Sequence, residues 1–384
     1  MAVLSSRGPQ GPETAGARIL VVNAGSSSLK LRVLGPDDRV LGSADLPAPR
    51  GHTDSADVAE AIRALGQVDA VGHRIVHGGT AYSHPVRVDP AVVARLEALT
   101  DLAPLHQPKS LTAMAAVSAV LPDVPAIACF DTAFHATLPA AASTYALPPE
   151  WRKRWDLRRF GFHGLSHAYA ARRAVELLDR PVEGLRLVTC HLGAGASLAA
   201  VSSGRSVDTT MGFTPLEGLV MATRSGSVDP GLVLWLLEHV GMPPAELAAT
   251  LEHRSGLLGL AGTADMRTVI TRAETGDDES RVAFDVYIHR LRSAIAAMAA
   301  SMGGLDALLF TGGVGERSSL VRASATAGLA FLGVELDPDR NAASGPEDRE
   351  LSGSGARVRT LVVAAREDLE IAHEVREVLG GPSA

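Results

Sequence analysis

Several residue types and patterns are scarce in this chain of 384 residues, and each scarcity narrows what the protein can be. Only two cysteines occur, Cys129 and Cys190, and each lies inside an apolar run, so we expect buried, reduced thiols. Aromatic residues make up 4% of the chain, which means that its cores must be largely aliphatic. No apolar run approaches the roughly 18 residues that a membrane-spanning helix needs.

Positive charge is scarce as well. The formal net charge is -7 and no cluster of Lys and Arg stands out, which argues against nucleic acid or an anionic membrane as the main partner. Residues 1–17, MAVLSSRGPQGPETAGA, lack the apolar segment of a secretory signal and are rich in Gly, Pro, Ser and Ala. We therefore expect a disordered N-terminal extension on a cytoplasmic protein.

The remaining sequence has the composition and order of an α/β protein. Hydrophobic residues make up 46% and charged residues 21%, an ordinary globular balance, and the length suggests two or three domains. Short apolar runs alternate with longer helical patterns, as in AIRALGQVDAVGHRIVHGG and LDALLFTGGVGERSSLVRASATAGLAFL. This alternation predicts strands separated by helices.

An internal repeat is visible when Arg18 is aligned with Arg186. RILVVNAGSSSLK then lies over RLVTCHLGAGASL, and Gly25 meets Gly193 after apolar strands of matching length. The match predicts two halves built from one unit, although two ordinary hairpins could also coincide in this way. Two lobes, each with a Gly-rich turn at a strand end, would suit a nucleotide held between them.

Three glycine-containing turns offer groups that bind phosphate. In NAGSSSLK, Gly25 permits close approach to the backbone, the serine run adds hydroxyls and Lys30 adds a cation; a polar hairpin is the alternative. HLGAGAS also follows an apolar strand, and its glycines would expose backbone N–H groups to a phosphate, although structural turns explain most such glycine pairs. FTGGVGERSS predicts a glycine loop, formed by Gly312, Gly313 and Gly315, that leads into a helix whose N-terminus would favour an anion.

Several charged residues have settings typical of ligand binding. Arg74 in GHRIVHGG and Arg224 in MATRSGS suit carboxylate or phosphate, although pairing with a structural carboxylate is the alternative for either one. Asp131 follows an apolar strand, where α/β proteins bind ligands, and helix capping is its alternative role. Glu367 begins the final helix pattern, as acidic residues commonly do.

A histidine pair lies in RRFGFHGLSH. His163 and His167 are four residues apart, a spacing that can hold a metal on one helix. Gly161 and Gly164 interrupt the helix around His163, so a zinc site is disfavoured. We expect His163 to be presented to a ligand from a loop, with a hydrogen-bonded histidine in a turn as the alternative.

These motifs occur in the order found in one known family. VVNAGSSSLK, GHRIVHGG, LAPLHQP, FDTAFH, RRFGFHGLSH, CHLGAGAS, MGFTPLEGL, TRSGSVDPG and FTGGVGERS together resemble the acetate kinase family. The resemblance runs from about Arg18 to near the C-terminus. It implies reversible, direct in-line phosphoryl transfer from ATP to acetate, giving acetyl phosphate and ADP.

The resemblance also implies an architecture. The fold would be that of acetate and sugar kinases, Hsp70 and actin, which is ribonuclease H-like: two lobes of duplicated ββαβαβ type with the active-site cleft between them. Residues 18–135 with 369–384 would form the N-terminal lobe, on the acyl substrate and phosphate side. Residues 136–368 would form a nucleotide-binding, dimerising C-terminal lobe. The family implies a homodimer that uses Mg²⁺ or Mn²⁺ with ATP and ADP as co-substrates.

Site residues are assigned by matching positions to the family's motifs. Those implied to act in catalysis are Arg74, Asp131, His163 and Arg224, with Asp131 holding a metal-bound water or orienting Arg74. Those implied to bind acetate are Arg74 and the methyl pocket of Val76, Leu105, Phe162 and Pro215. Asn23 and Glu367 are implied to bind the metal. Nucleotide contacts are implied for Ser26, Ser28, Lys30, His191, Leu192, Gly193, Ala194, Gly195, Asp265, Met266, Arg267, Gly313, Val314, Gly315, Glu316 and Arg317.

The chain departs from the family's usual pattern at a few positions. Ala194 and Arg317 each replace a usual asparagine, Ala222 replaces a glycine and Gln107 an asparagine. The first two bear on nucleotide affinity and base preference rather than on the reaction. A propionate or butyrate kinase of the same family is the nearest alternative. A nucleotide-binding sensor without catalysis is more remote, because such a protein would lose the arginines or His163.

Overall fold

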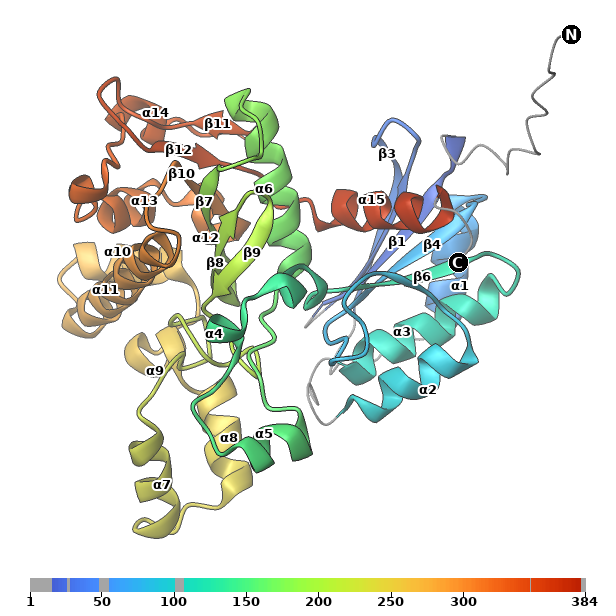
Figure 1. Ribbon diagram of the computed structural model, residues 1–384, viewed down its shortest axis with the longest axis horizontal. Coiled ribbons are helices and arrows are strands. Elements are labelled where there is room, and N and C mark those ends of the chain that lie inside the picture. Colours follow the sequence, from blue (N-terminus) through green and yellow to red (C-terminus); the bar gives the residue numbers. More distant parts are fainter. Residues whose placement is uncertain (1–15, 26–27, 48–54, 101–106, 346, 381–384) are drawn as a thin grey trace, which may run out of the picture. The chain divides into compact units, whose positions relative to one another are not determined.

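The computed structural model describes residues 16–380, apart from 26–27, 48–54, 101–106 and 346 (Figure 1). The chain forms two compact units: unit 1 comprises Met1–Ala133 and Glu367–Ala384, and unit 2 comprises Phe134–Arg366. The sequence predicts lobe boundaries after residues 135 and 368, close to these positions. The roles assigned to the two lobes stay predictions. Most of the expected N-terminal extension lies outside the described residues.

A twisted sheet of six described strands forms the centre of unit 1, in the order β3-β2-β1-β4-β6-β5. The strands are β1 (Ile19–Ala24), β2 (Ser28–Leu34), β3 (Val40–Pro47), β4 (Ala70–Ile75), β5 (Val86–Arg87) and β6 (Ala126–Phe130). The first three form an antiparallel meander, β4 and β6 continue the sheet in parallel with β1, and β5 closes one edge in the antiparallel direction.

The sheet of unit 2 repeats this topology strand for strand, in the order β9-β8-β7-β10-β12-β11. Its strands are β7 (Arg186–Leu192), β8 (Ala196–Ser202), β9 (Arg205–Thr209), β10 (Ala307–Thr311), β11 (Arg349–Glu350) and β12 (Arg359–Val362). The same meander, parallel pair and antiparallel edge recur. Strand β7 takes the place of β1, as the alignment of Arg18 with Arg186 predicts, so the duplicated α/β architecture is confirmed.

Helices cover both faces of the unit 1 sheet (Figure 1). They are α1 (Ser55–Leu65), α2 (Pro90–Ala98), α3 (Gln107–Val120) and α15 (Glu367–Gly380). Val71 of β4 lies in an aliphatic core with α1 and α3. The next residue, Gly72, faces α15 so closely that a Cβ there would lie 2.8 Å from Val375. Because neighbouring strand residues point to opposite faces, α15 packs opposite α1 and α3.

Unit 2 carries the larger set of described helices. They are α4 (Ala140–Ser143), α5 (Pro149–Trp155), α6 (Gly164–Leu178), α7 (Pro230–Glu238), α8 (Pro244–His253), α9 (Gly256–Ala261), α10 (Met266–Glu274), α11 (Asp278–Ser301), α12 (Gly312–Arg317), α13 (Ser319–Thr326) and α14 (Pro338–Ala342). Short 3₁₀ turns occur at Ala133–Thr137 and Ala330–Leu332. Helix α11 packs on β7, β8 and β9, and α6 packs on β7 and β10.

The composition-based expectations agree with the interior. Both cysteines are free and buried, and the buried side chains are mostly aliphatic. In the part of the chain that the structure describes, every helix is too short or too polar to span a bilayer.

The run FTGGVGERSS differs from its prediction as a glycine loop. Strand β10 ends at Thr311, and the short helix α12 begins at once at Gly312. Gly312 has a positive φ of 76°, and a Cβ there would lie 2.8 to 3.1 Å from the backbone of Leu192 in β7. The glycine is therefore needed for close packing against the neighbouring strand, and the chain enters a helix directly.

Candidate active site

Three parallel strands of unit 1 carry polar side chains at their carboxyl ends. Asn23 lies near the end of β1, Arg74 near the end of β4, and Asp131 directly follows β6. The strand register pairs Val22 with His73 and Ile75 with Phe130, so the three polar residues meet at one edge of the sheet. This is the edge at which α/β sheets commonly bind ligands.

Arg74 joins these side chains into one cluster. Its Nε donates to Asp131 Oδ1 at 3.0 Å and its Nη2 to Asp131 Oδ2 at 2.6 Å, a two-pronged ion pair. Its Nη1 donates to Asn23 Oδ1 at 3.1 Å and lies 3.7 Å from Glu367 Oε2. The Asn23 amide donates in turn to Glu367 Oε2 at 3.1 Å. Arg74 therefore has a carboxylate partner, as the structural alternative expects, and that partner orients it; ligand binding by Arg74 stays a prediction.

The charges in this cluster do not cancel. Burial works against the charge of Arg74, but attraction to Asp131 and Glu367 raises the pKa of its guanidinium and keeps it cationic. Burial also raises the pKa of the Asp131 carboxyl, an effect that Arg74 opposes. Two carboxylates thus share one guanidinium, and the excess negative charge favours a cation.

The donor set fits magnesium held together with a nucleotide. Asn23 and Glu367 supply an amide oxygen and a carboxylate, the hard oxygen ligands that Mg²⁺ prefers. Among the described residues, no group of three or more His, Cys, Asp or Glu side chains could hold a metal by itself.

In unit 2, a turn of the β7–β8 hairpin brings a histidine and an arginine together. A Cβ placed on Gly195 would lie 3.2 Å from Cε1 and Nε2 of His163 and 3.5 Å from Nη1 of Arg224. Only a residue without a side chain leaves this space free. The turn is tied to the Arg224 loop by a bond from the Ala222 N–H to the Ala194 carbonyl at 3.1 Å.

His163 lies directly before α6 with a left-handed backbone, φ 56°. Its ring stacks on His191, with centroids 4.4 Å apart, and its Nδ1 is hydrogen-bonded to Ser197 Oγ at 2.9 Å. His167 also bonds Ser197, through Nε2 at 2.8 Å. The two histidines therefore share one serine hydroxyl.

Arg224 has different surroundings from Arg74. Its Nη1 donates to the Pro215 carbonyl at 3.1 Å and lies 3.9 Å from Met221 Sδ. Burial lowers the pKa of Arg224, an effect that Glu252 opposes. A cation that burial disfavours would gain from an incoming anion.

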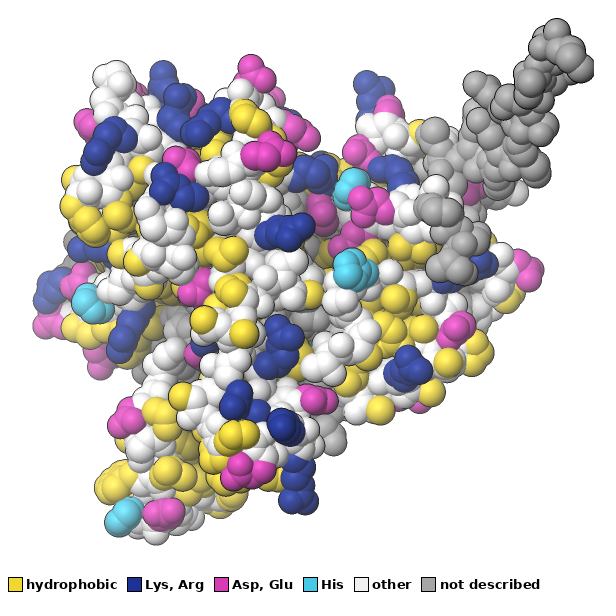
Figure 2. Space-filling view, viewed as in Figure 1, with side chains coloured by type: hydrophobic (Ala, Val, Ile, Leu, Met, Phe, Trp, Pro, Cys, Tyr) yellow, Lys and Arg dark blue, Asp and Glu magenta, His cyan; other side chains and the backbone are white. Residues whose placement is uncertain are grey.

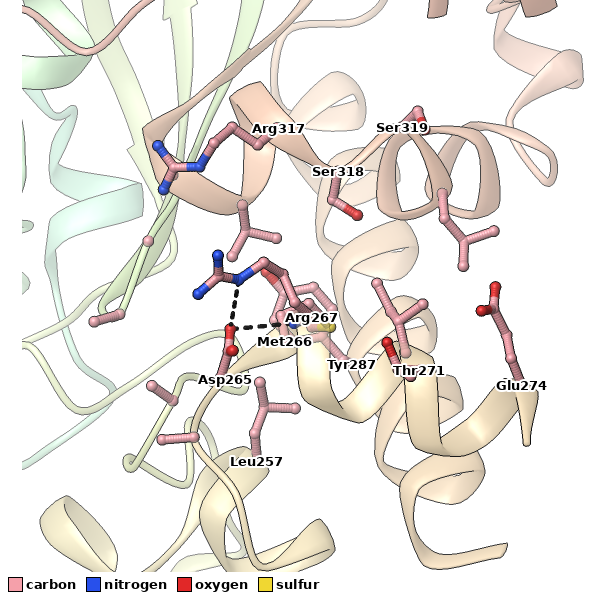
Figure 3. A pocket seen from close by; sticks show the side chains of 18 residues that line it. Leu257, Asp265, Met266, Arg267, Thr271, Glu274, Tyr287, Arg317, Ser318 and Ser319 are labelled. Atoms are coloured by element: carbon pink, nitrogen blue, oxygen red, sulfur yellow. Dashed lines mark hydrogen bonds and ion pairs between the residues drawn. The ribbon is translucent and has the colours of Figure 1, made fainter. Parts of the chain in front are cut away.

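A pocket of about 590 Å³ opens beside the same turn, entirely within unit 2. The predicted nucleotide residues that line it are Gly193, Ala194, Asp265, Met266, Arg267, Gly313, Val314 and Arg317. Figure 3 shows the guanidinium groups of Arg267 and Arg317 directed toward one end of the pocket, with Glu274 at the opposite end. Asp265 caps α10 and bonds Arg267 Nε at 3.2 Å.

Other lining residues escaped the sequence analysis. They are Leu257, Ala264, Ile270, Thr271, Glu274, Tyr287, Ser318, Ser319 and Leu320, while Ala222, noted as a departure from the family pattern, also lines the pocket. Met266, Ile270 and Glu274 recur at intervals of four, which places them on one face of α10. This four-residue spacing could have been recognised in the sequence. The lining residues of α9 and α11, Leu257 and Tyr287, could not, because tertiary packing brings them to the pocket.

The other described residues that were predicted to bind the nucleotide do not line this pocket. Leu192 is in the core of unit 2, and Gly315 is buried. Glu316 Oε1 accepts from the Ala365 N–H at 3.0 Å, a structural contact. Lys30 is exposed on β2 opposite Asn23, and Ser28 begins that strand.

The residues assigned to the methyl pocket are mostly apolar and buried. Val76 follows β4 and Phe162 precedes His163, with exposed fractions of 7% and 1%. Pro215 holds Arg224 through its carbonyl. Two predicted residues, Leu105 and Ser26, lie outside the described residues.

Comparison with known proteins shows which family the chain belongs to. Residues 52–373 match the model of the Acetokinase family. The chain belongs to the acetokinase family. Relatives include an acetate kinase of Synechococcus sp. (strain JA-2-3B'a(2-13)), 50% identical over 82% of this chain and 78% of the relative. An acetate kinase of Shouchella clausii is 40% identical over 93% of this chain and 98% of the relative.

Solved structures of the acetokinase family share the fold. The crystal structure of an acetate kinase from Porphyromonas gingivalis superimposes with a TM-score of 0.87 at 34% identity, covering 94% of this chain and all of that one (100%). A propionate kinase from Francisella tularensis gives 0.85 at 33% identity, covering 93% and 98%. The fold is thus the two-lobed, actin-like ATPase fold that the resemblance implies.

Proposed function

We propose that this protein is a phosphotransferase that moves the γ-phosphoryl group of ATP to acetate, giving acetyl phosphate and ADP, and that it runs in both directions. Membership of the acetokinase family supports the reaction. The observation that carries it is the β7–β8 turn, where Gly193 and Ala194 line the pocket while Gly195 faces His163 and Arg224. One turn thus connects a nucleotide-sized pocket to two side chains suited to a phosphoryl group.

The nucleophile needs no general base. A carboxylic acid has a pKa of about 4 to 5 and is ionised at neutral pH. Asp131 is therefore free to act through Arg74, which its two-pronged ion pair supports. The chemical task is to bring an acetate anion to a highly charged nucleotide. We propose that Arg74, Arg224 and Lys30 offset this repulsion and that His163 donates to the phosphoryl oxygens of a loose, in-line transition state.

We propose that Asn23 and Glu367 hold Mg²⁺ or Mn²⁺ bound to the nucleotide. When bound, the ion would neutralise charge on the phosphate oxygens. The excess negative charge around Arg74 supports a cation at this edge of the unit 1 sheet.

We propose that the acyl group contacts Val76, Leu105, Phe162 and Pro215. A small apolar pocket discriminates one methylene by only about 1 to 3 kcal/mol, so propionate would be a poorer substrate rather than an excluded one. The likeness to the Francisella tularensis propionate kinase favours testing this second acid directly.

We propose that the protein is a cytoplasmic homodimer whose subunits meet through unit 2. Helix α7 has no buried residue, and Leu232, Leu234 and Trp235 are 47%, 54% and 51% exposed. Figure 2 shows apolar side chains gathered over α7 and α8. A partner would cover this surface, and a second copy is the usual partner of such a patch. The free, buried cysteines suit a reducing compartment.

The proposed reaction is tested by trapping the acyl phosphate. The purified protein is incubated with ATP, Mg²⁺, acetate and hydroxylamine, and acetyl hydroxamate is measured together with ADP. We expect the two products in equal amounts, dependence on the divalent cation, and faster turnover with acetate than with propionate or butyrate. Nucleotide binding without hydroxamate from any of the three acids would contradict the proposal and favour a sensor.

A further inference from the structure

Ser197 lies between two histidine rings in the interior of unit 2. Its Oγ is 2.9 Å from His163 Nδ1 and 2.8 Å from His167 Nε2, both hydrogen bonds. Ser197 and His167 are fully buried, with exposed fractions of 0%. The serine therefore cannot contact a substrate, and any effect it has on catalysis must pass through a neighbour.

The chain of bonds continues behind Ser197. His167 Nδ1 is 2.7 Å from Thr189 Oγ1, and Thr189 Oγ1 lies 3.4 Å from the Ala199 carbonyl. Thr189 is fully buried on β7, and Ser197 belongs to the adjoining strand β8. A helix residue and two neighbouring strands thus fix the position of the serine hydroxyl from behind.

Proton counting makes these bonds interdependent. A hydroxyl carries one proton, so Ser197 donates to one ring and accepts from the other. Burial lowers the pKa of His167 well below its usual value, so that ring is neutral, with one donor and one acceptor nitrogen. Thr189 Oγ1 donates to the Ala199 carbonyl and so accepts from His167 Nδ1–H. This leaves His167 Nε2 to accept from Ser197 and Ser197 to accept from His163 Nδ1–H. The tautomer of His163 is thereby coupled to that of His167, with the proton on Nδ1, and Nε2 can donate to a phosphoryl oxygen only when the ring is cationic.

The geometry around His163 shows what this coupling fixes. His191 stacks on its face, and Ser197 holds its Nδ1 edge. The opposite edge, with Cε1 and Nε2, lies over Gly195 beside Arg224, where a Cβ would be 3.2 Å from both ring atoms. A rotation of the ring would break the Ser197 bond and turn Nε2 away from this position.

We propose that Ser197, held by His167 and Thr189, is a positioning residue that fixes the orientation and tautomer of His163 so that Nε2 faces the phosphoryl group. This rests on the function proposed above. Ser197 is not among the residues that family resemblance assigned to the site; it emerges from the hydrogen bonds alone.

A double-mutant cycle tests the proposal. The variants Ser197→Ala, His163→Ala and the double variant are compared with the wild type in the hydroxamate assay. We expect Ser197→Ala to lower kcat by about tenfold to a hundredfold, the usual cost of misplacing a catalytic group, with the KM for ATP within about twofold. In the His163→Ala background the same substitution should change kcat by less than about twofold, because its target is gone.

Two further variants separate positioning from folding. Thr189→Val keeps the shape but removes the hydroxyl at the far end of the chain, so we expect a smaller loss of kcat that also vanishes in the His163→Ala background. Ser143→Ala removes another buried hydroxyl of unit 2, one that bonds the Pro139 carbonyl, and should leave kcat unchanged. Thermal melting and ADP binding check that each variant is folded.

The outcomes are distinct. An equal loss from Ser197→Ala with and without His163 would overturn the positioning role, as would wild-type turnover in either Ser197→Ala or His163→Ala. If Ser197→Ala does not fold, the Thr189→Val cycle decides by the same comparison. A wild type that makes no acyl phosphate refutes the proposed function itself, which the trapping assay shows independently.

Discussion

At the scale of single residues, the two arginines of the candidate site differ in what holds them. Arg74 is paired with Asp131 and lies near Glu367, so its charge is balanced by the protein. Arg224 contacts a carbonyl and a sulfur, and burial lowers its pKa. An anion bound beside Arg224 would offset part of the cost of its burial, as attraction to Glu252 already does, which supports our proposal that Arg224 stabilises the transferring charge.

Replacing Arg224 with alanine should lower kcat by at least about a hundredfold and change the KM for ATP modestly, as arginines in phosphoryl transfer do elsewhere. Steady-state kinetics in both directions measure this. Arg281→Ala, which removes an exposed arginine paired with Asp278 on α11, is the matched control and should be neutral. Near-normal turnover in Arg224→Ala would remove its assigned role.

Residue types were more predictable from the sequence than their contacts. The glycine-flanked arginines and histidine stood out because such settings suit ligands. The family resemblance suggested that Asp131 could orient Arg74, but the spacing alone could not show this, since the two are 57 residues apart. The bond between His167 and Ser197, 30 residues apart, was not predicted. Only the strand register and the packing of α6 on β7 bring these groups within bonding distance.

At the scale of elements, the β7–β8 turn is the most constrained piece of the site. A methyl group on Gly195 would lie 3.2 Å from the His163 ring, closer than ordinary contact. We expect Gly195→Ala to lower kcat by about tenfold or more, because the added methyl would displace the His163 ring beside Arg224. Gly345→Ala, where a Cβ meets nothing within 4 Å, is the control. Unchanged kcat in Gly195→Ala would mean that the phosphoryl group does not pass this turn.

Helix α15 contains a partly buried glutamate, Glu374, whose protonation should make the stability of the fold depend on pH. Burial raises the pKa of Glu374 to about 8, with Glu370 and Glu377 adding to the rise and Cys129 opposing it. An unfolded glutamate has a pKa of about 4.3, so between the two values the folded state holds a proton that the unfolded state releases. Stability should therefore be fullest below the unfolded pKa and decline as the pH rises through about 8.

Glu374→Gln should remove most of this decline, because a neutral amide has no proton to lose. Urea unfolding of the variant and the wild type on the acid and alkaline sides of the raised pKa measures the effect. Glu97→Gln changes an exposed acid on α2 that is not among the groups raising this pKa and should follow the wild type. Parallel pH profiles for Glu374→Gln and the wild type would show that Glu374 is ionised in the fold.

Some of the strands and helices could be predicted from the sequence. Hairpins and parallel strands followed from apolar runs and from the repeat, and the start of α15 at Glu367 was marked by its acidic first turn. The helix α12 was missed because Gly312, Gly313 and Gly315 have low helix propensity. Packing against β7 and β10 overrides that preference.

At the scale of the whole molecule, the repeat alignment predicted the duplicated topology, since each half needs the same strand order to bury its sheet. The surface through which two chains would associate could not be predicted from the sequence pattern in the same way. The exposed face of α7 is apolar on more than one side, and a single-chain sequence pattern does not distinguish such a helix from a buried one.

Trp235→Glu should separate the proposed dimer, because a charge would be placed in a surface that is covered on association. Light scattering coupled to size exclusion should give the mass of one chain, 39.9 kDa, in place of about twice that value. Phe331→Glu alters a more exposed apolar residue, at 70%, away from α7 and should leave the dimer intact. A dimeric Trp235→Glu would place the interface elsewhere.

The central proposal is that the guanidinium groups of Arg74 and Arg224 both act on the phosphoryl group during transfer. A crystal grown with Mg²⁺, ADP, aluminium fluoride and acetate tests it most directly. We predict that Arg74, Arg224 and His163 Nε2 all contact the fluoride between ADP and acetate. Guanidinium groups that keep their bonds to Asp131 and to the Pro215 carbonyl, with the fluoride out of their reach, would contradict the account.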